Sequence, residues 1–377
     1  MRTTQPVSSA ARMQPPASVR GPVGWARANL FSSWWSTAVT LALGYLILKA
    51  GLELAHWGVL NAVWSVPTKA DMTPDPTLCL TAHGEGACWA VIAEKYRFIL
   101  FGRYPYVEQW RPAICIALFI ALFVISSRRW AWRQELALLW IAILTAIGIL
   151  MWGGVFGLVF VEQDIWGGLP ITLILATFGL AFAFPLSILV ALGRRSTGLP
   201  AVRVLCVLYV ELIRGVPLIS LLFMASVMFP LFLPEGINID KLLRAQIAII
   251  LFAAAYLAEV VRGGLQALPR GQYEAADALG LSYWRKTSLV ILPQALRLVI
   301  PPLVNTFIGF FKDTSLVLII GIFDLLTAGK IALSEPAWQA YGTEVYLALA
   351  VVYFLFCFAM SRYSRGLEAE FNRDRKR

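Results

Sequence analysis

The chain has 377 residues, of which 59% are hydrophobic and 14% are charged, and its mean hydropathy is +0.71. These values exclude an ordinary soluble domain, which is about 45–50% apolar and about 25% charged, and they predict an integral membrane protein. The net charge of +10 does not indicate nucleic-acid binding, because a basic binding face would need a soluble module and the sequence offers none.

Eight segments are apolar and long enough to cross a membrane, which takes about 20 apolar residues. The predicted spans are 34–62, 111–127, 134–155, 168–192, 204–230, 244–262, 294–323 and 344–361. The first, fifth and seventh are long enough to be tilted or broken, and Pro217, Pro301 and Pro302 can break two of them. The predicted fold is therefore all-α, with about eight transmembrane helices.

The N-terminal part combines a polar tail, three spans and one sizeable loop. Residues 1–33 are rich in Arg, Ser, Ala and Pro and begin without the apolar core of a secretion signal, so we expect a disordered cytoplasmic tail. Residues 34–165 form an extension whose soluble loop is 63–110. Cys79 and Cys88 lie in this loop, where they either form a disulfide or remain two free thiols.

Two acid–base pairs lie inside or at the ends of predicted spans. An ionisable side chain at the centre of a span costs about 3 kcal/mol, so each is a candidate for function. Glu211 and Arg214 are three residues apart, as are Glu259 and Arg262, and each pair shares one helix face. One interpretation is a local salt bridge that neutralises itself. Glu259 and Arg262 also adjoin the loop that follows and could brace it.

The polar loop 263–293 interrupts the apolar pattern. It opens with helix-breaking residues, which are Gly263, Gly264, Pro269 and Gly271. A short helix is predicted from Glu274, with its acids in the first turn and Gly280 at a C-cap position. Its residues are Glu274, Ala275, Ala276, Asp277, Ala278 and Leu279. We expect this helix to be exposed at the surface.

The seventh predicted span contains a concentrated polar cluster. Two opposite charges and two hydroxyl groups follow one another inside an apolar segment: Lys312, Asp313, Thr314 and Ser315. Such groups need polar partners at that depth. This cluster is therefore a candidate binding site.

Lys and Arg gather in the N-terminal tail, in the loops after the second and fourth spans, in loop 263–293 and in the basic segment 362–377. Loops rich in these residues stay in the cytoplasm. We therefore expect both termini and loop 263–293 to be cytoplasmic, and loop 63–110 to lie on the opposite side.

Loop 263–293 resembles the EAA loop of ABC importer permeases, whose pattern is Glu-Ala-Ala, three residues, Gly, nine residues and Ile-x-Leu-Pro. The matching residues are Glu274, Ala275, Ala276, Gly280, Leu292 and Pro293. Val290 replaces the Ile. From Gly167 onward, segments such as LYVELIRGVPLI and FFKDTSLVLIIG are similar to those of polar amino acid ABC permeases. The longer N-terminal part resembles the M-type permease of bacterial general L-amino acid importers.

This resemblance implies a type I importer permease core of five helices within 166–361. It implies ATP-driven import of L-amino acids, polar, acidic or of broad range, from periplasm to cytoplasm across the bacterial inner membrane. The implied partners are two cytoplasmic ATPase subunits, a second and shorter permease chain, a periplasmic amino acid binding protein, the substrate and membrane lipid. No cofactor is expected on this chain, since ATP and Mg would bind the ATPase.

The same resemblance suggests roles for the candidate residues. The helix of Glu274, Ala275, Ala276, Asp277 and Gly280 would dock into the ATPase and transmit its closure. The stretch Lys312–Ser315 would line the translocation pathway, with Asp313 facing a substrate ammonium group and Lys312 a carboxylate. The alternative is an ion pair at the interface of two permease chains. Glu211, Arg214, Glu259 and Arg262 would shape the pathway or a subunit contact.

An enzyme site is not expected, because the chain has neither a phosphate-binding GxxxxGK[ST] motif nor a metal-binding pattern among its two His residues. An ion-coupled secondary carrier is the alternative function. Such carriers usually show inverted repeats and unpaired membrane acids, and neither is evident here. The sequence leaves open which amino acids are carried, whether the permease pair is identical or mixed, and what the first three spans do.

Overall fold

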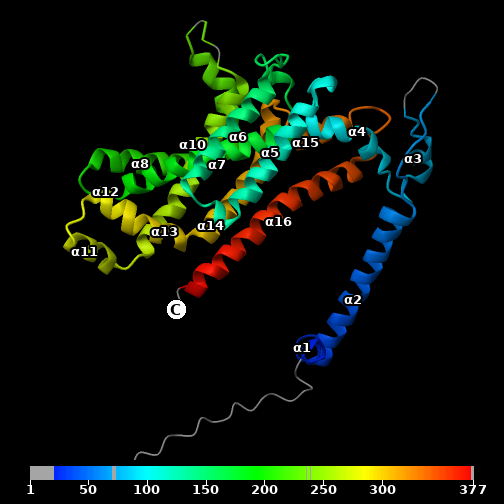
Figure 1. The fold of residues 1–377 in the computed structure, drawn as a ribbon. Coiled ribbons are helices and arrows are strands. Elements are labelled where there is room, and N and C mark those ends of the chain that lie inside the picture. The colour runs from blue at the N-terminus through cyan, green and yellow to red at the C-terminus, as the bar shows by residue number, and fades with distance from the viewer. Residues whose placement is uncertain (1–20, 70–73, 235, 238, 375–377) are drawn as a thin grey trace, which may run out of the picture. The chain divides into compact units, whose positions relative to one another are not determined.

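The computed structural model describes residues 21–69, 74–234, 236–237 and 239–374. Within these residues the chain is helical, and its β-structure is limited to isolated bridges. It divides into two compact units, Met1–Ala90 and Val91–Arg377 (Figure 1). The spans near 111–127 and 134–155 therefore belong to the same unit as the last five, because α5 packs against α7.

The first unit carries one long apolar helix and a small disulfide-bonded loop. Its helices are α1 (Gly21–Asn29), α2 (Trp34–Ala55), the π-helix η2 (His56–Leu60) and α3 (Thr77–Ala82). Cys79 and Cys88 are bonded, with their Cα atoms 5.5 Å apart, and both are buried. The Trp89 indole donates to the Gly58 carbonyl at 2.7 Å, which ties the loop to the end of the long helix.

Part of the range 1–33, which the sequence predicts to be a disordered tail, is helical in the structure. Helix α1 occupies Gly21–Asn29, and Ser33 caps the next helix by accepting from the Ser36 amide at 3.2 Å. Pro22 does not prevent α1 because it lies in the first turn, where a missing N–H is tolerated. Residues 1–20 lie outside the described residues.

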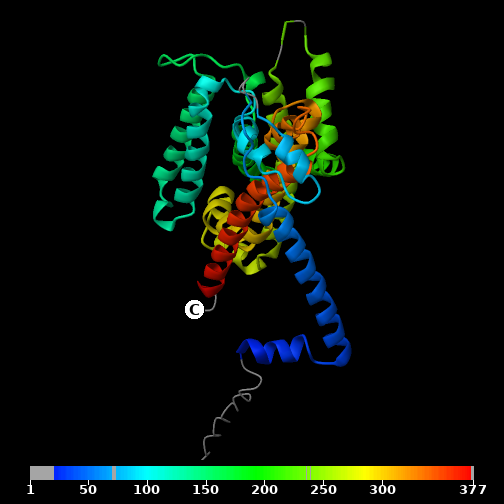
Figure 2. The same cartoon turned by 90° about the vertical axis from the view of Figure 1, so that its right-hand side faces the viewer.

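The second unit contains the remaining helices. Its α-helices are α4 (Ala90–Phe101), α5 (Trp110–Ser126), α6 (Gln134–Trp152), α7 (Leu169–Arg194), α8 (Pro200–Arg214), α9 (Leu218–Phe223), α10 (Lys241–Ala267), α11 (Arg270–Ala278), α12 (Tyr283–Arg285), α13 (Leu292–Leu298), α14 (Ile300–Asp313), α15 (Leu325–Ala332) and α16 (Gly342–Asp374). Short 3₁₀- and π-helices are η3 (Tyr106–Glu108), η4 (Arg129–Ala131), η5 (Gln163–Ile165), η6 (Met224–Met228), η7 (Phe229–Phe232), η8 (Lys286–Ile291) and η9 (Thr314–Ile320). Figure 2 shows α5 and α6 as an antiparallel pair at the edge of this unit.

Seven helices of the described chain are long and apolar enough to cross a membrane, and an eighth span results if one bent pair is counted. The all-α prediction with about eight spans is confirmed. The bent pair is Pro200–Arg214 with Leu218–Phe232, which meet at 103°. Pro217 is the N-cap of α9, so this proline breaks the fifth span as predicted.

The seventh predicted span, 294–323, is also broken. Helix α13 ends at Leu298, and the spanning helix begins at Ile300. Pro301 lies in the first turn of α14 and therefore starts this helix. Proline is suited to that position because its φ angle is already helical.

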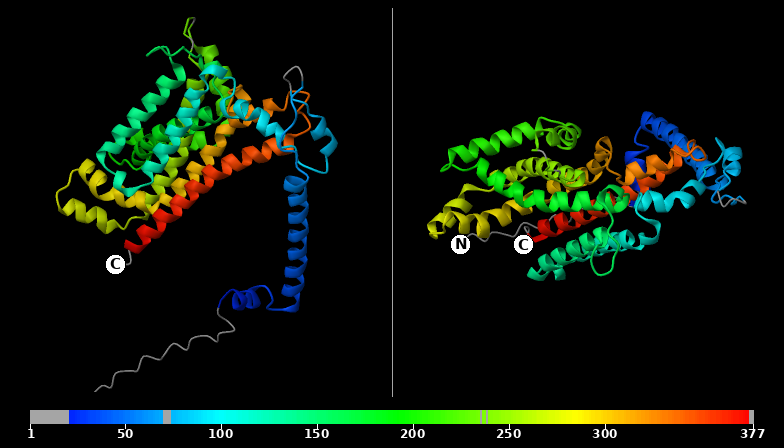
Figure 3. Two further views of the ribbon diagram at one scale, coloured as in Figure 1. Left: turned by 45° about the vertical axis from the view of Figure 1, so that its right-hand side comes forward. Right: turned by 90° about the horizontal axis from the view of Figure 1, so that it is seen from above.

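Helices α7 and α10 form the centre of the second unit and pack along each other. Small residues permit this close approach. A Cβ atom added to Gly179 would lie 2.9 Å from a methyl carbon of Ile249, and four alanines of α10 are almost completely buried, which are Ala253, Ala254, Ala255 and Ala258. The view from above in Figure 3 shows α7 and α10 side by side between α8 and α16.

The short helix of the polar loop begins earlier than predicted. Helix α11 starts at Arg270, after Pro269 at the N-cap position, so Glu274 is not in its first turn. Proline sets this start by fixing its own φ angle. The end agrees with the prediction, since Gly280 has φ +71°. Gly280 N donates to Asp277 O at 2.9 Å and Leu281 N to Ala276 O at 3.2 Å, which is a Schellman cap.

Candidate functional site

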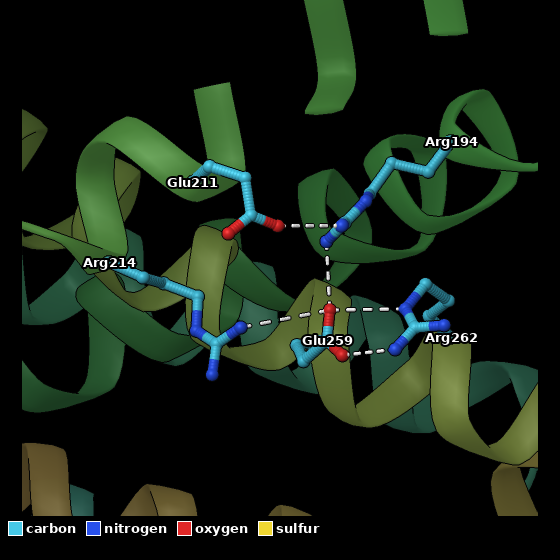
Figure 4. Close-up of polar contacts among 5 residues, drawn as sticks. All are labelled: Arg194, Glu211, Arg214, Glu259 and Arg262. Atoms are coloured by element: carbon cyan, nitrogen blue, oxygen red, sulfur yellow. Dashed lines mark hydrogen bonds and ion pairs between the residues drawn. The ribbon is translucent and has the colours of Figure 1, made fainter. Parts of the chain in front are cut away.

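Five charged side chains from three helices meet where α7, α8 and α10 end. This arginine cluster consists of Arg194, Glu211, Arg214, Glu259 and Arg262 (Figure 4). Arg194 lies 2.8 Å from Glu259 and 2.9 Å from Glu211. Glu259 also pairs with Arg262 and lies 3.8 Å from Arg214. Glu259 therefore faces three guanidinium groups, and the cluster contains one more arginine than carboxylates.

Sequence reasoning found four of these residues but did not find their pairing. The local pair of Glu259 with Arg262 is present. In the described chain no ion pair within 4.0 Å joins Glu211 to Arg214, and Glu211 bonds instead to Arg194 at 2.9 Å. Arg194 was missed because its partners are 17 and 65 residues away, and no local pattern indicates such a contact.

An aromatic cavity lies one helical turn from the cluster. Its volume is about 410 Å³. The lining residues are Leu218, Phe252, Tyr256, Thr306, Gly309, Phe310, Asp313 and Leu316. The ring centroids of Phe252, Tyr256 and Phe310 are 4.8 to 6.2 Å apart. The guanidinium carbon of Arg214 lies 5.4 Å from the Tyr256 ring, so the cluster and the cavity share a contact.

Of the predicted polar stretch in α14 and η9, Asp313 is the residue that lines this cavity. Lys312 is exposed and Asp313 is half-buried, and among the described residues no ion pair within 4.0 Å joins them. Thr314 donates to the Phe311 carbonyl and Ser315 to the Lys312 carbonyl, both at 2.8 Å. The two hydroxyls therefore satisfy the local backbone, and one carboxylate faces the cavity.

The polar loop presents one buried and one exposed face. Ala276 is 2% exposed, and Asp277 pairs with Lys286 at 2.5 Å. Glu274, Ala275 and Gly280 are exposed. Three large apolar side chains near them are also exposed, which are Leu279, Tyr283 and Trp284. Sequence reasoning placed Leu279 in the exposed helix without giving it a role and did not identify Tyr283 or Trp284, although exposed apolar residues on a polar loop are a signal of an interaction surface.

The residue that follows Arg194 reaches the same loop. Arg195 donates to the Leu265 carbonyl at 2.8 Å and to the Tyr273 hydroxyl at 2.9 Å. Tyr273 in turn donates to the Leu265 carbonyl at 2.9 Å. Two consecutive arginines at the end of α7 thus contact different parts of the unit. Arg194 contacts the arginine cluster, and Arg195 contacts α11.

At the other end of the unit a buried carboxylate joins two helices, α15 and α16. Asp324 is completely buried and caps α15 by accepting from the amides of Leu326 and Thr327 at 3.1 and 3.0 Å. The Tyr353 hydroxyl of α16 donates to it at 3.4 Å. Burial raises the pKa of Asp324, and the hydrogen bonds from Thr327 oppose that rise. In the part of the chain described, no group of three or more His, Cys, Asp or Glu side chains could hold a metal ion.

Comparison with known proteins gives consistent matches. The family described as binding-protein-dependent transport system inner membrane component matches residues 183–373. The inner membrane amino-acid ABC transporter permease protein YhdY of Escherichia coli (strain K12) is 50% identical, over 93% of this chain and 93% of that protein. The glutamate/glutamine/aspartate/asparagine transport system permease protein BztC of Rhodobacter capsulatus is 38% identical over 96% of both chains. A solved structure titled as an amino acid ABC transporter with histidines is 30% identical, with a TM-score of 0.48, over 54% of this chain and 92% of that chain.

Proposed function

This chain belongs to the family of binding-protein-dependent transport system inner membrane components, and on that premise we propose that it is the membrane permease of an ATP-driven importer of L-amino acids. The observation that carries this proposal is the 50% identity to an amino-acid ABC transporter permease over 93% of both chains. The ion-coupled secondary carrier finds no support in these relatives.

The polar loop is the proposed contact with the ATPase. Leu279, Tyr283 and Trp284 are 78%, 51% and 66% exposed, and buried aromatic anchors contribute much of the binding energy at interfaces. The short helix α11 ends at a glycine cap, so it can be moved as one rigid piece. Two cytoplasmic ATPase subunits would bind ATP and Mg, and this chain would hold no cofactor of its own.

The end of α7 is the proposed route from the ATPase to the pathway. When the ATPase subunits approach each other, α11 moves and pulls on Arg195 through the Tyr273 hydroxyl, which lies 2.9 Å from it. Arg194 moves with Arg195 because they are adjacent in the chain. Glu259 has three arginine neighbours, so it can exchange partners without being left unpaired. Switching transitions commonly repack salt bridges in this way.

The aromatic cavity is the proposed substrate site. An amino acid brings an ammonium group that needs an acceptor in a non-aqueous site, and Asp313 is the carboxylate among the cavity-lining residues. The rings of Phe252, Tyr256 and Phe310 supply an apolar wall for the rest of the molecule. One relative is named for glutamate, glutamine, aspartate and asparagine, so we expect polar or acidic amino acids.

The remaining features of the assembly follow from the family. A second permease chain, shorter and different, would cover the exposed side of the cavity, and a periplasmic binding protein would deliver the substrate. The protein would lie in the bacterial inner membrane with both termini in the cytoplasm, because Lys and Arg gather on the side of α11 and α16's end.

The test begins with the native complex. We expect the tagged chain to co-purify with an ATPase and a second permease, and the reconstituted complex to accumulate L-glutamate or L-glutamine when ATP is supplied. Gly280→Asp should reduce uptake at least tenfold while the chain remains in the membrane, because a carboxylate is placed beside the ATPase contact and an uncompensated buried charge costs several kcal/mol.

Gly280→Asn is the matched control, because asparagine tolerates a positive φ angle and adds no charge. A loss of uptake in Gly280→Asp of less than about twofold, which is under about 0.5 kcal/mol, would contradict the proposal. Recovery of the chain without any ATPase, under conditions that preserve other membrane complexes, would contradict it as well.

A further inference from the structure

The start of α10 lies at the end of the unit opposite to α11 (Figures 1 and 3), and residues at that end line a second cavity. Its volume is about 230 Å³. The lining residues are Arg103, Gln163, Asp164, Trp166, Ile171, Asp240, Lys241, Leu242, Gly321, Ile322 and Phe323. They come from the loop after α4, the segment before α7, the start of α10 and the turn after η9. Side chains of both charges therefore converge from three separate segments, which are the loop after α4, the segment before α7 and the start of α10.

Backbone contacts give this cavity a rigid frame. A Cβ atom added to Gly102 would lie 2.6 Å from the Cα atom of Gly167, so the two loops touch. Gly168 N donates to the Phe323 carbonyl at 2.9 Å, and Gly168 also forms a β-bridge with Asp324. Each glycine permits a contact that a side chain would obstruct. The cavity is therefore formed in the chain itself before any ligand arrives.

Arg103 and Lys241, the two cationic side chains of the cavity, have N–H donors available for hydrogen bonds. The guanidinium carbon of Arg103 lies 3.8 Å from the centroid of the Phe323 ring. Stacking of this kind uses the face of the guanidinium and leaves its N–H donors, which point outward in its plane, for other partners. Among the described residues, neither Arg103 nor Lys241 has a carboxylate oxygen within 4.0 Å. A bound carboxylate would meet two unpaired positive groups here.

The two carboxylates of the cavity differ in how many hydrogen bonds they already accept. Asp240 accepts from the backbone amides of Leu242 and Leu243 at 2.8 and 3.3 Å, and the Gln163 side chain donates to it when its amide is turned so that the nitrogen faces Asp240. Asp164 is exposed and, in the part of the chain described, has no cation within 4.0 Å. Asp164 therefore has acceptor capacity left for a ligand, whereas Asp240 caps α10.

We propose that this cavity is a receiving site for a free L-amino acid, which it holds before the molecule passes to the aromatic cavity. The substrate carboxylate binds Arg103 and Lys241, and the ammonium group binds Asp164. Two cations and two carboxylates give a lining that matches a zwitterion in charge. The volume is below the roughly 300–1,000 Å³ of sites for drug-sized ligands, as suits an amino acid. This proposal rests on the proposed import function.

Protection from chemical labelling tests the site directly. The complete complex would carry Leu242→Cys, and its labelling by a small thiol reagent would be followed with L-glutamine as the probe and with no ATP or binding protein present. The parent complex without Leu242→Cys corrects for the natural cysteines. At a concentration about ten times the Kd, L-glutamine should slow labelling about tenfold.

Three controls show whether protection depends on both charges of the amino acid and on the cavity itself. N-acetyl-L-glutamine and L-glutaminamide, which lack one of the two charges, should protect poorly. Arg103→Gln should abolish protection by L-glutamine. Lys95→Gln should keep it, because Lys95 pairs with Glu335 at 2.6 Å and does not line the cavity. If Leu242→Cys prevents assembly, Ile322→Cys reports on the same cavity.

Several outcomes would contradict the proposal that this cavity binds a free amino acid. These are absence of protection in a complex that imports L-glutamine, equal protection by the blocked analogues, and protection that survives Arg103→Gln. Protection that appears only when the binding protein is added would assign the cavity to protein docking and would also overturn it. Failure of the import function is distinguishable, since the parent complex would then show no ATP-dependent uptake whatever the labelling shows.

Discussion

Arg111 and Arg194 each lie at the end of a membrane helix, but the hydrogen bonds of their guanidinium groups go to different kinds of partner, although a Glu108 carboxylate oxygen also lies 3.6 Å from Arg111. Arg111 is completely buried and donates to the backbone carbonyls of Leu150, Val159 and Met151 at 2.6, 2.8 and 3.4 Å. Two of these carbonyls belong to the last turn of α6, which helix geometry leaves without internal donors. Arg111 therefore fixes α5 to α6 through atoms that cannot move independently of the helix.

Arg194 bonds instead to the carboxylates of Glu259 and Glu211, at 2.8 and 2.9 Å. Those carboxylates are on side chains of two other helices, and Glu259 has further arginine partners within reach. Such pairs can break and form again as the helices shift. One arginine is thus a permanent anchor and the other an adjustable contact. Burial alone does not tell them apart, since Arg194 is only 11% exposed.

The largest effect is expected from substitution of Arg111, the residue that fixes α5 to α6. Arg111→Gln should remove most of the folded chain from the membrane, because the Val159 carbonyl would lose its donor and the Leu150 and Met151 carbonyls would keep only the Tyr104 hydroxyl, at 3.4 and 3.0 Å. A buried carbonyl without a donor costs about 1–3 kcal/mol. The amount of chain in the membrane and its melting temperature are the measurements. Arg194→Gln is the matched control, and it should leave both close to the parent values. Equal damage from the two substitutions would break the comparison.

Substitution of Glu259, the central carboxylate of the arginine cluster, tests whether its ion pairs are adjustable contacts. Glu259→Gln removes the charge that faces three arginines, so uptake should fall about 10- to 100-fold while assembly with the partners persists, as expected for a charged hydrogen bond worth about 1.5–3 kcal/mol. Uptake per assembled complex is the measurement. Glu259→Asp keeps the charge and should recover part of the rate. Loss of assembly in Glu259→Gln would show that the cluster is an anchor too.

Substitution of Asp313 tests whether the aromatic cavity next to the arginine cluster binds the substrate. Asp313→Asn should reduce uptake about tenfold with assembly intact, because a substrate ammonium group would lose one charged partner, worth about 1.4 kcal/mol or more. Ser315→Ala is the control, since its hydroxyl bonds to the local Lys312 carbonyl at 2.8 Å. If Asp313→Asn disrupts the pairing with the second permease, the residue belongs to a subunit interface.

The smallest effect is expected at the link between α11 and α7. Tyr273→Phe removes the hydroxyl that accepts from Arg195 at 2.9 Å but keeps the ring. The hydroxyl also donates to the Leu265 carbonyl, but only its bond to Arg195 links α11 to α7. One hydrogen bond is worth about 1 kcal/mol, so we expect about a fivefold rise in the ATP hydrolysed per amino acid imported. Tyr346→Phe, at an exposed tyrosine of α16, is the control. An unchanged ratio in Tyr273→Phe would remove Arg195 from the coupling route.

Features encoded by neighbouring residues could be predicted from the sequence. The spans follow from apolar length, and the end of α11 follows from Gly280, because a positive φ angle at C′ favours glycine. The start of α11 was wrong because acids at Glu274 and Asp277 were given more weight than Pro269. The exposed apolar residues of the loop, such as Trp284, were not predicted either, because the motif is defined by small side chains.

Contacts between distant segments could not be predicted. The bond from Arg194 to Glu259 spans 65 residues, and the carbonyl partners of Arg111 carry no side-chain signature at all. Asp313 was identified as polar and costly in a span, but its place beside Phe252 and Tyr256 depends on how α10 and α14 pack. The sequence therefore indicates which residues need partners, and the fold decides which partners they find.

The redox state of Cys79 and Cys88 reports whether a copy of the protein has completed its insertion into the membrane. Such a bond forms where oxidants act and is rare where thiols are kept reduced, so on the proposed topology a newly made chain would carry two thiols until the loop has left the cytoplasm. The loop closed by the bond is short, with a sequence separation of 9. Resistance of these two cysteines to alkylation would therefore distinguish inserted molecules from those still being synthesised, without any added tag.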